Sequence, residues 1–87
     1  MKRYKIVLLV ILASLVPHFI KAQLNTEQVM IIGRNALYFE DYVLSIQYFN
    51  KVIEARPYLH EPYFFRALAK FNLEDYSGAE DDLTASI

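Results

Sequence analysis

The chain of 87 residues contains no cysteine and no tryptophan, and it has only two glycines and two histidines. Without cysteine, disulfide bonds, thiolate metal sites and a lipid-modified N-terminal cysteine are all excluded. The two glycines, Gly33 and Gly78, lie far apart and cannot form a glycine-rich phosphate-binding loop. These absences leave a narrow range of chemistry.

Acidic residues are absent from residues 1–22, which hold four of the nine basic residues. The apolar stretch from Ile6 to Val16 follows this basic start, and Pro17 comes directly after it. This order is typical of a secretory signal peptide, and we predict cleavage after Ala22, which leaves Gln23 as the new N-terminus. Eleven helical residues cover about half of a ~30 Å hydrocarbon core, so a spanning helix is the weaker interpretation.

The predicted signal peptide sets the expected location of the protein. We expect it to be exported, either periplasmic or secreted, with only transient membrane contact through residues 1–22. The alternative is an uncleaved N-terminal segment that anchors the protein to the membrane. All ten acidic residues lie after Ala22, so this part is acidic and has no basic stripe for nucleic acid.

A repeated tripeptide marks the part after Ala22, because Glu-Asp-Tyr stands at residues 40–42 and again at 74–76, 34 positions later. The same offset aligns small residues with small and apolar with apolar, as for Gly33 with Ala67, Ser45 with Ala79 and Phe49 with Leu83. A fixed period of this length indicates a chain built from repeated units.

Each unit reads as two helices. In the first unit, one helix begins at Thr26 and a second follows Asp41, a residue type favoured at helix N-caps. Their apolar faces are expected to hold Val29, Ile32, Gly33 and Ala36, and then Val43, Ile46, Phe49 and Ile53.

Proline should separate this unit from the next. Pro57 cannot continue a helix and moves Arg56 out of the helical region, whereas Pro62 is tolerated in a first turn, with His60 as a possible cap. The third helix should present Tyr63, Ala67 and Lys70 on one face and Phe64, Leu68 and Phe71 on another. Asp75 should begin the last helix, which carries Ala79 and Leu83 toward the third.

With this pattern, residues 26–87 resemble the tetratricopeptide repeat (TPR) family, in an exported bacterial form. The resemblance implies an all-α fold of antiparallel helix hairpins, part of an α-solenoid with one and a half to two repeats after the hydrophobic signal helix. It divides the chain into a signal peptide at 1–22, one repeat at 26–59 and a second, incomplete repeat at 60–87. The positions that match the family's structural pattern are Gly33, Tyr42, Ser45, Phe49, Pro57, Tyr63, Ala67, Tyr76, Ala79 and Leu83. Val29, Ala36, Val52 and Ser86 depart from it.

The resemblance also implies a concave, partner-binding face. The residues that it places there are Glu27, Met30, Arg34, Leu37, Tyr38, Glu61, Phe64, Leu68, Phe71 and Asn72. Such an apolar surface, with Arg34, Tyr38 and Asn72 as polar groups, suits an extended peptide or a partner helix. The family's clamp for a terminal carboxylate is not supported, because its positions hold Met30, Arg34, Phe64 and Leu68. Alternatively, Phe64, Leu68 and Phe71 form a packing surface for another helix.

No catalytic, cofactor-binding or metal-binding set can be assembled from the residues after Ala22. His60 stands alone there and reads as a capping or surface residue. Adjacent Glu80, Asp81 and Asp82 point in different directions around a helix and lack the pattern of a calcium loop, so we expect a solvated acidic face.

The sequence therefore favours an exported scaffold without catalysis, which binds a protein or peptide that the residues do not identify. Two alternatives stay open: the N-terminal part of a larger exported protein with its functional domain beyond Ile87, or a small membrane-tethered helical protein. Because a repeat buries its apolar face only against neighbours, residues 23–87 should be marginally stable alone. Self-association through the exposed face of the second hairpin would be one way to cover this face and stabilise the fold.

Overall fold

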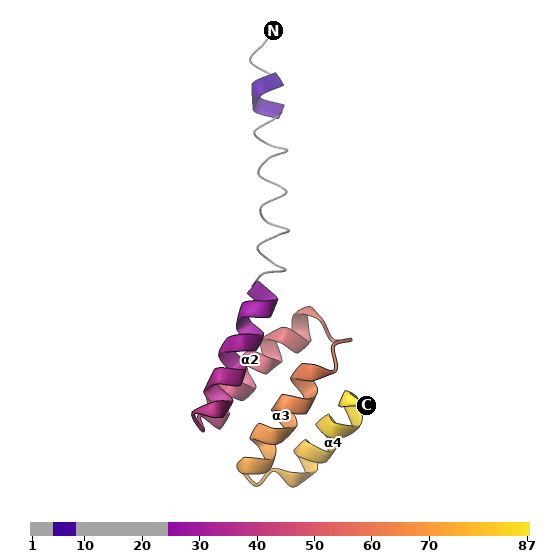
Figure 1. Ribbon diagram of the computed structural model, residues 1–87. Helices are drawn as coiled ribbons and strands as arrows, with labels where there is room; N and C mark the ends of the chain where they lie inside the picture. Colours follow the sequence, from indigo (N-terminus) through magenta and orange to yellow (C-terminus); the bar gives the residue numbers. More distant parts are fainter. Residues whose placement is uncertain (1–4, 9–24) are drawn as a thin grey trace.

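The computed structural model describes residues 5–8 and 25–87, and these are helical with no strand among them (Figure 1). A helix over residues 25–38 precedes α2 (Tyr42–Ala55), α3 (Glu61–Asn72) and α4 (Tyr76–Ser86). Of the predicted signal peptide, only residues 5–8 are described, as one exposed helical turn, and the remainder lies outside the described residues. In residues 5–8 and 25–87 no helix is long and apolar enough to cross a membrane. The all-helical expectation is confirmed.

The helices form two hairpins, and the turns of both hairpins share a pattern of backbone hydrogen bonds. The backbone N–H of Asp41 donates to the carbonyl of Ala36 at 2.8 Å, and that of Asp75 donates to Lys70 at 2.9 Å. The two donors are 34 residues apart in the chain, and so are the two acceptors. The period seen in the sequence is therefore also a period of the backbone.

The residue before each of these donors has a left-handed backbone. Glu40 and Glu74 have φ angles of 64° and 65°, and their N–H groups donate to Leu37 and Phe71, each at 3.0 Å. This pair of bonds around a left-handed residue is the Schellman ending of a helix, where glycine is the usual choice. Both hairpins thus carry the same strained glutamate.

Replacing Glu74 by glycine is expected to stabilise the protein by about 1 kcal/mol, because glycine adopts this φ without the clash that a Cβ causes. Urea unfolding followed by circular dichroism measures the change. The matched control is Glu80→Gly, in an exposed helical position of α4, which should destabilise the protein by roughly 0.5–1 kcal/mol. If both variants changed the free energy of unfolding in the same direction, the role of φ at Glu74 would be contradicted.

The starts of α2, α3 and α4 differ in whether the cap residue makes a hydrogen bond. Asp75 accepts a hydrogen bond from the N–H of Gly78 at 3.0 Å, as expected for an N-cap. Asp41 and His60 occupy the same position before α2 and α3, but neither side chain makes a capping hydrogen bond. Of these three expected caps, only the one at the start of α4 is confirmed.

The linker between the hairpins is fixed by proline and tyrosine. Arg56 leaves the helical region, with φ −141° and ψ 75°, and Pro62 stands in the first turn of α3, as the sequence predicts. The hydroxyl of Tyr63 donates to the carbonyl of Pro57 at 2.9 Å. This bond ties α3 back to the end of the first hairpin.

The core lies where α3 packs on the first hairpin. Phe49 is fully buried and stacks on Phe65 of α3, with ring centroids 6.0 Å apart. The predicted small residues Gly33, Ser45, Ala67 and Ala79 are all buried, which confirms their expected place at close helix contacts. Val52, a departure from the family pattern, is also buried and is part of this core.

Four positions expected on apolar core faces are exposed instead. Tyr76 is 57% exposed and Leu83 43%, because no helix among the described residues covers this side of α4; only the ring of Phe71 contacts Tyr76 there. Val43 and Ile32 also face solvent at the edges of their helices. The repeat alignment placed Tyr76 in the core and helical periodicity placed the other three there, and neither shows how wide the covered part of a helix face is.

A buried ion network joins the second hairpin to the first, and it corrects the expectation of a solvated acidic face. The Asp82 carboxylate is nearly inaccessible; Arg66 donates to both of its oxygens, at 2.7 and 2.8 Å, and Lys70 lies 2.9 Å away. Arg66 also donates to the side-chain carbonyl of Asn50 in α2 at 2.8 Å. Glu80 and Asp81 are exposed as expected, but Asp82 faces α3 because it lies one turn from Ala79.

Candidate functional site

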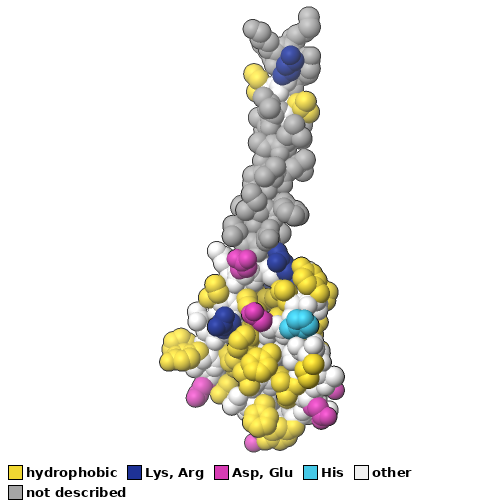
Figure 2. Space-filling model, turned by 45° about the vertical axis from the view of Figure 1, so that its right-hand side comes forward, with side chains coloured by type: hydrophobic (Ala, Val, Ile, Leu, Met, Phe, Trp, Pro, Cys, Tyr) yellow, Lys and Arg dark blue, Asp and Glu magenta, His cyan; other side chains and the backbone are white. Residues whose placement is uncertain are grey.

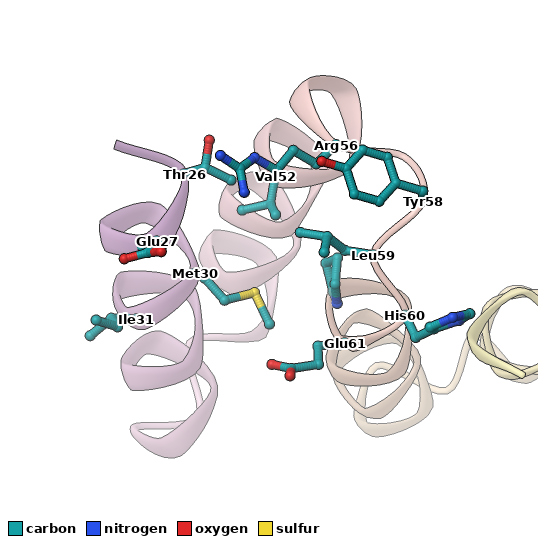
Figure 3. Close-up of a pocket in the computed structure, with 11 residues that line it drawn as sticks. Thr26, Glu27, Met30, Ile31, Val52, Arg56, Tyr58, Leu59, His60 and Glu61 are labelled. Atoms are coloured by element: carbon teal, nitrogen blue, oxygen red, sulfur yellow. The ribbon is translucent and has the colours of Figure 1, made fainter. Parts of the chain in front are cut away.

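A hollow of about 560 Å³ opens at the junction of helix 25–38, the C-terminal end of α2, the linker and the start of α3 (Figure 3). Its volume is in the range of small-ligand and side-chain pockets. The lining residues are Thr26, Glu27, Met30, Ile31, Val52, Arg56, Tyr58, Leu59, His60, Glu61 and Pro62. The site is thus built by both hairpins and the chain between them.

The side chains of this hollow divide into a floor and a rim. In Figure 3, Met30 and Leu59 point toward each other between the helices, and Glu61 extends from α3 toward Met30. Ile31 and His60 point outward, on opposite sides. The interior is therefore mainly apolar and offers a carboxylate at its edge, an arrangement that accepts an apolar side chain and orients its neighbours.

A second hollow of about 470 Å³ adjoins the first, since His60 and Glu61 line both. Its other lining residues are Arg34, Phe64, Phe65 and Ser86. The guanidinium of Arg34 lies over the ring of Phe65, 5.1 Å from the centroid. This cation–π contact holds the charge at the rim, where it remains exposed. We call the two adjoining hollows the groove.

Half of the ten residues predicted for the concave face line the groove. These are Glu27, Met30, Arg34, Glu61 and Phe64. The other five, Leu37, Tyr38, Leu68, Phe71 and Asn72, line neither hollow, since they lie toward the opposite end of their helices. Carrying over family positions thus included five residues that line the groove and five that lie outside it, and their role in binding stays a prediction.

Two of the expected polar groups lie outside the groove. The side-chain amide of Asn72 donates to the carbonyl of Leu68, one turn back on α3, at 2.8 Å. Tyr38 is 80% exposed and packs edge-to-face on the neighbouring Phe39 at the tip of the first hairpin. Arg34 alone of the three expected polar groups lies at the groove.

Sequence reasoning missed the contribution of the linker. Arg56, Tyr58 and Leu59 line the first hollow, although the sequence analysis treated this stretch only as a helix break. A signal was available, because tyrosine and leucine follow Pro57 in a loop where polar residues are usual. Tyr58 is 70% exposed, which leaves its ring free to contact a ligand.

The groove combines apolar and charged side chains. On the face of the helical part that Figure 2 shows, hydrophobic side chains cover much of the surface, with acidic, basic and histidine side chains among them. Within residues 5–8 and 25–87, no group of three or more histidine, aspartate or glutamate side chains could hold a metal ion. An apolar floor with charges of both signs at the rim favours a peptide segment over a highly charged ligand.

Comparison of the chain with family models, with curated proteins and with solved structures found no match.

Proposed function

We propose that this protein is an exported scaffold of the tetratricopeptide type, whose groove binds a segment of another protein and performs no catalysis. One observation carries the proposal: side chains from two successive hairpins and their linker converge on adjoining hollows with an apolar floor. The repeat of the turn hydrogen bonds at the spacing of 34 residues supports the assignment to this repeat class. The sequence of residues 1–22 supports export.

The groove suggests how a ligand segment would be oriented. An apolar side chain of the ligand would enter the first hollow beside Met30 and Leu59. Glu27 and Glu61 at this hollow favour a basic neighbour, and Arg34 at the second hollow favours an acidic or carbonyl group. The preferred ligand is therefore a short segment with an apolar anchor between charges of opposite sign.

Selection from a displayed library of random peptides tests the proposal, using protein purified from cells that express the whole chain. The mass of the purified protein also reports whether it begins near Gln23, as export predicts. Enriched peptides should share an apolar anchor. Met30→Glu and Phe64→Asp should each weaken their binding at least about tenfold, or 1.4 kcal/mol, because a charge would replace an apolar contact.

The matched control is Gln47→Asp, on an exposed position of α2 that lines neither hollow. It should leave binding unchanged. Failure to enrich any peptide, or equal loss of binding in all three variants, would overturn the assignment of the groove.

A further inference from the structure

The two hairpins repeat in sequence but differ in what covers them. Phe49 on α2 is fully buried under α3, whereas Leu83, its equivalent on α4, is 43% exposed. Tyr42 is half-buried, and its equivalent Tyr76 is 57% exposed and packs edge-to-face only on Phe71. The exposed apolar side chains Phe71, Tyr76, Leu83 and Ile87 are called the end face. In the described part of the chain nothing packs over it.

The first hairpin shows what kind of helix such a face accepts. α2 and α3 are consecutive and antiparallel, and the Phe49–Phe65 stack fixes their register. One helical turn away in each direction, this register sets Val52 opposite Pro62 and Ser45 opposite Ala69, and all four residues are buried. The fitting helix therefore carries one large apolar residue between two compact ones.

Helix 25–38 lies 34 residues before α3 and carries the equivalent side chains on a free surface. Gln28, Ile31 and Asn35 stand at the positions of Pro62, Phe65 and Ala69, and all three are exposed. Figure 3 shows Ile31 pointing away from α3, on the outer side of helix 25–38. Phe39, at the end of this surface, is 77% exposed. Gln28, Ile31, Asn35 and Phe39 are called the start face.

Placing the start face of one copy on the end face of another gives pairs of matched chemistry. Ile31 would meet Leu83, an apolar pair in place of Phe65 and Phe49. Gln28 would meet Ser86, so an amide faces a hydroxyl where Pro62 faces Val52.

The third pair would set Asn35 over Ala79, in place of Ala69 over Ser45. Ala79 is already buried within its own copy, so the new contact depends on the other pairs. None of these three pairs brings together charges of the same sign. We propose that the end face binds helix 25–38 of a second copy of this chain, so that copies stack head to tail.

Such a contact is heterologous, because each copy uses a different surface on each side, and it can add further copies at both ends. Because the contact packs one helix against one hairpin, we expect its area to be small compared with the roughly 800 Å² per partner of a standard interface. Association should therefore be weak and concentration-dependent. The stacking surfaces share Ile31 and Ser86 with the lining of the groove, whereas Phe39, Tyr76 and Leu83 line neither hollow. Stacking is measured by sedimentation and the function proposed for the groove by peptide binding, so each can fail without the other.

Sedimentation velocity of the purified protein over a range of concentrations tests the stacking. The wild type should grow beyond a dimer as concentration rises. Leu83→Asp destroys the end face and Ile31→Asp destroys the start face, so each variant alone should remain monomeric. Mixed together, the two should form a one-to-one dimer and nothing larger, because each supplies the surface that the other lacks.

Gln47→Asp, which changes neither face, should associate like the wild type. Circular dichroism should show unchanged helicity for the variants, since both replaced side chains are partly exposed; a second pair, Tyr76→Asp and Phe39→Asp, repeats the test if either variant loses helicity. A monomeric wild type at all concentrations, self-association that persists in Ile31→Asp, or a mixture that stays monomeric would each overturn the proposal.

Discussion

Replacing Asp82 by alanine is expected to destabilise the protein by about 3 kcal/mol, the low end of the range for breaking a buried ion pair. The variant would leave the side chains of Arg66 and Lys70, only 18% and 22% exposed, without their anionic partner. A core of this size rarely supplies more than about 3–5 kcal/mol, so most of the folded population should be lost. Urea unfolding followed by circular dichroism measures the effect.

The adjacent Asp81 provides the matched control: it is exposed, and replacing it by alanine removes the same negative charge as Asp82→Ala. Asp81→Ala should shift the free energy of unfolding by less than about 0.5 kcal/mol. Equal losses in the two variants would show that net charge, and not the network around Asp82, sets the stability.

The same network predicts a dependence of stability on pH. Burial disfavours the ionised form of Asp82, but the hydrogen bonds from Arg66 and Lys70 outweigh it and lower the pKa of the carboxyl. The pKa of Arg66 is raised, chiefly by its hydrogen bond to Asp82, so the guanidinium stays charged. A carboxyl with a lowered pKa contributes stability above its unfolded value of about 3.9, and this is lost as pH falls through the folded pKa.

The stability difference between wild type and Asp82→Ala should therefore be full at neutral pH and shrink below about pH 4. Taking the difference removes the contribution of the other carboxyl groups, which both proteins share. A difference that stays constant down to pH 2 would contradict the ionic origin of the effect.

Replacing Gly33 by leucine should destabilise the protein by about 3 kcal/mol, at the upper end of the usual cost of overpacking. A Cβ at this position would lie 2.8 Å from a ring carbon of Phe49 and 3.1 Å from the Cβ of Tyr48. Phe49 cannot retreat, because it is fully buried and stacked on Phe65. The melting temperature, measured by circular dichroism, should fall accordingly.

Two further variants establish whether the close contact is the cause. Ala79→Leu changes a buried small residue of the second hairpin and should also lower the melting temperature. Gln47→Leu adds a similar side chain at an exposed position of α2 and should change it little. A loss at Gln47 as large as that at Gly33 would argue against a special contact between helix 25–38 and α2.

The sequence predicted the helices and their order because the signals for them are local. Pro57 ends α2 and Pro62 begins α3 through restrictions on their own backbones, so no distant partner is needed. The recurrence of Glu-Asp-Tyr located both hairpin turns, where the backbone bonds repeat at the same spacing. Small residues at matching positions predicted where helices approach closely, and those residues are buried.

The candidate site could be predicted only in part, because a groove depends on how three segments meet. Met30 and Glu61 came from the repeat pattern, whereas Tyr58 and Leu59 belong to a linker that the pattern treats as a simple connection. Nothing in the sequence near Asn72 shows that its amide will bond to its own helix. Side-chain partners of this kind are decided by rotamers in the packed chain.

The sequence by itself determined the helical repeat, the turns and the close contacts, since each follows from the residue type at a fixed spacing. Only the tertiary structure decided which of three adjacent acids would be buried, and why that is tolerable. Asp82 lies under α3 because Arg66 and Lys70, sixteen and twelve residues earlier, face it across the hairpin. A buried charge is stable only with its partners in place, and the partners are set by packing rather than by the neighbouring sequence.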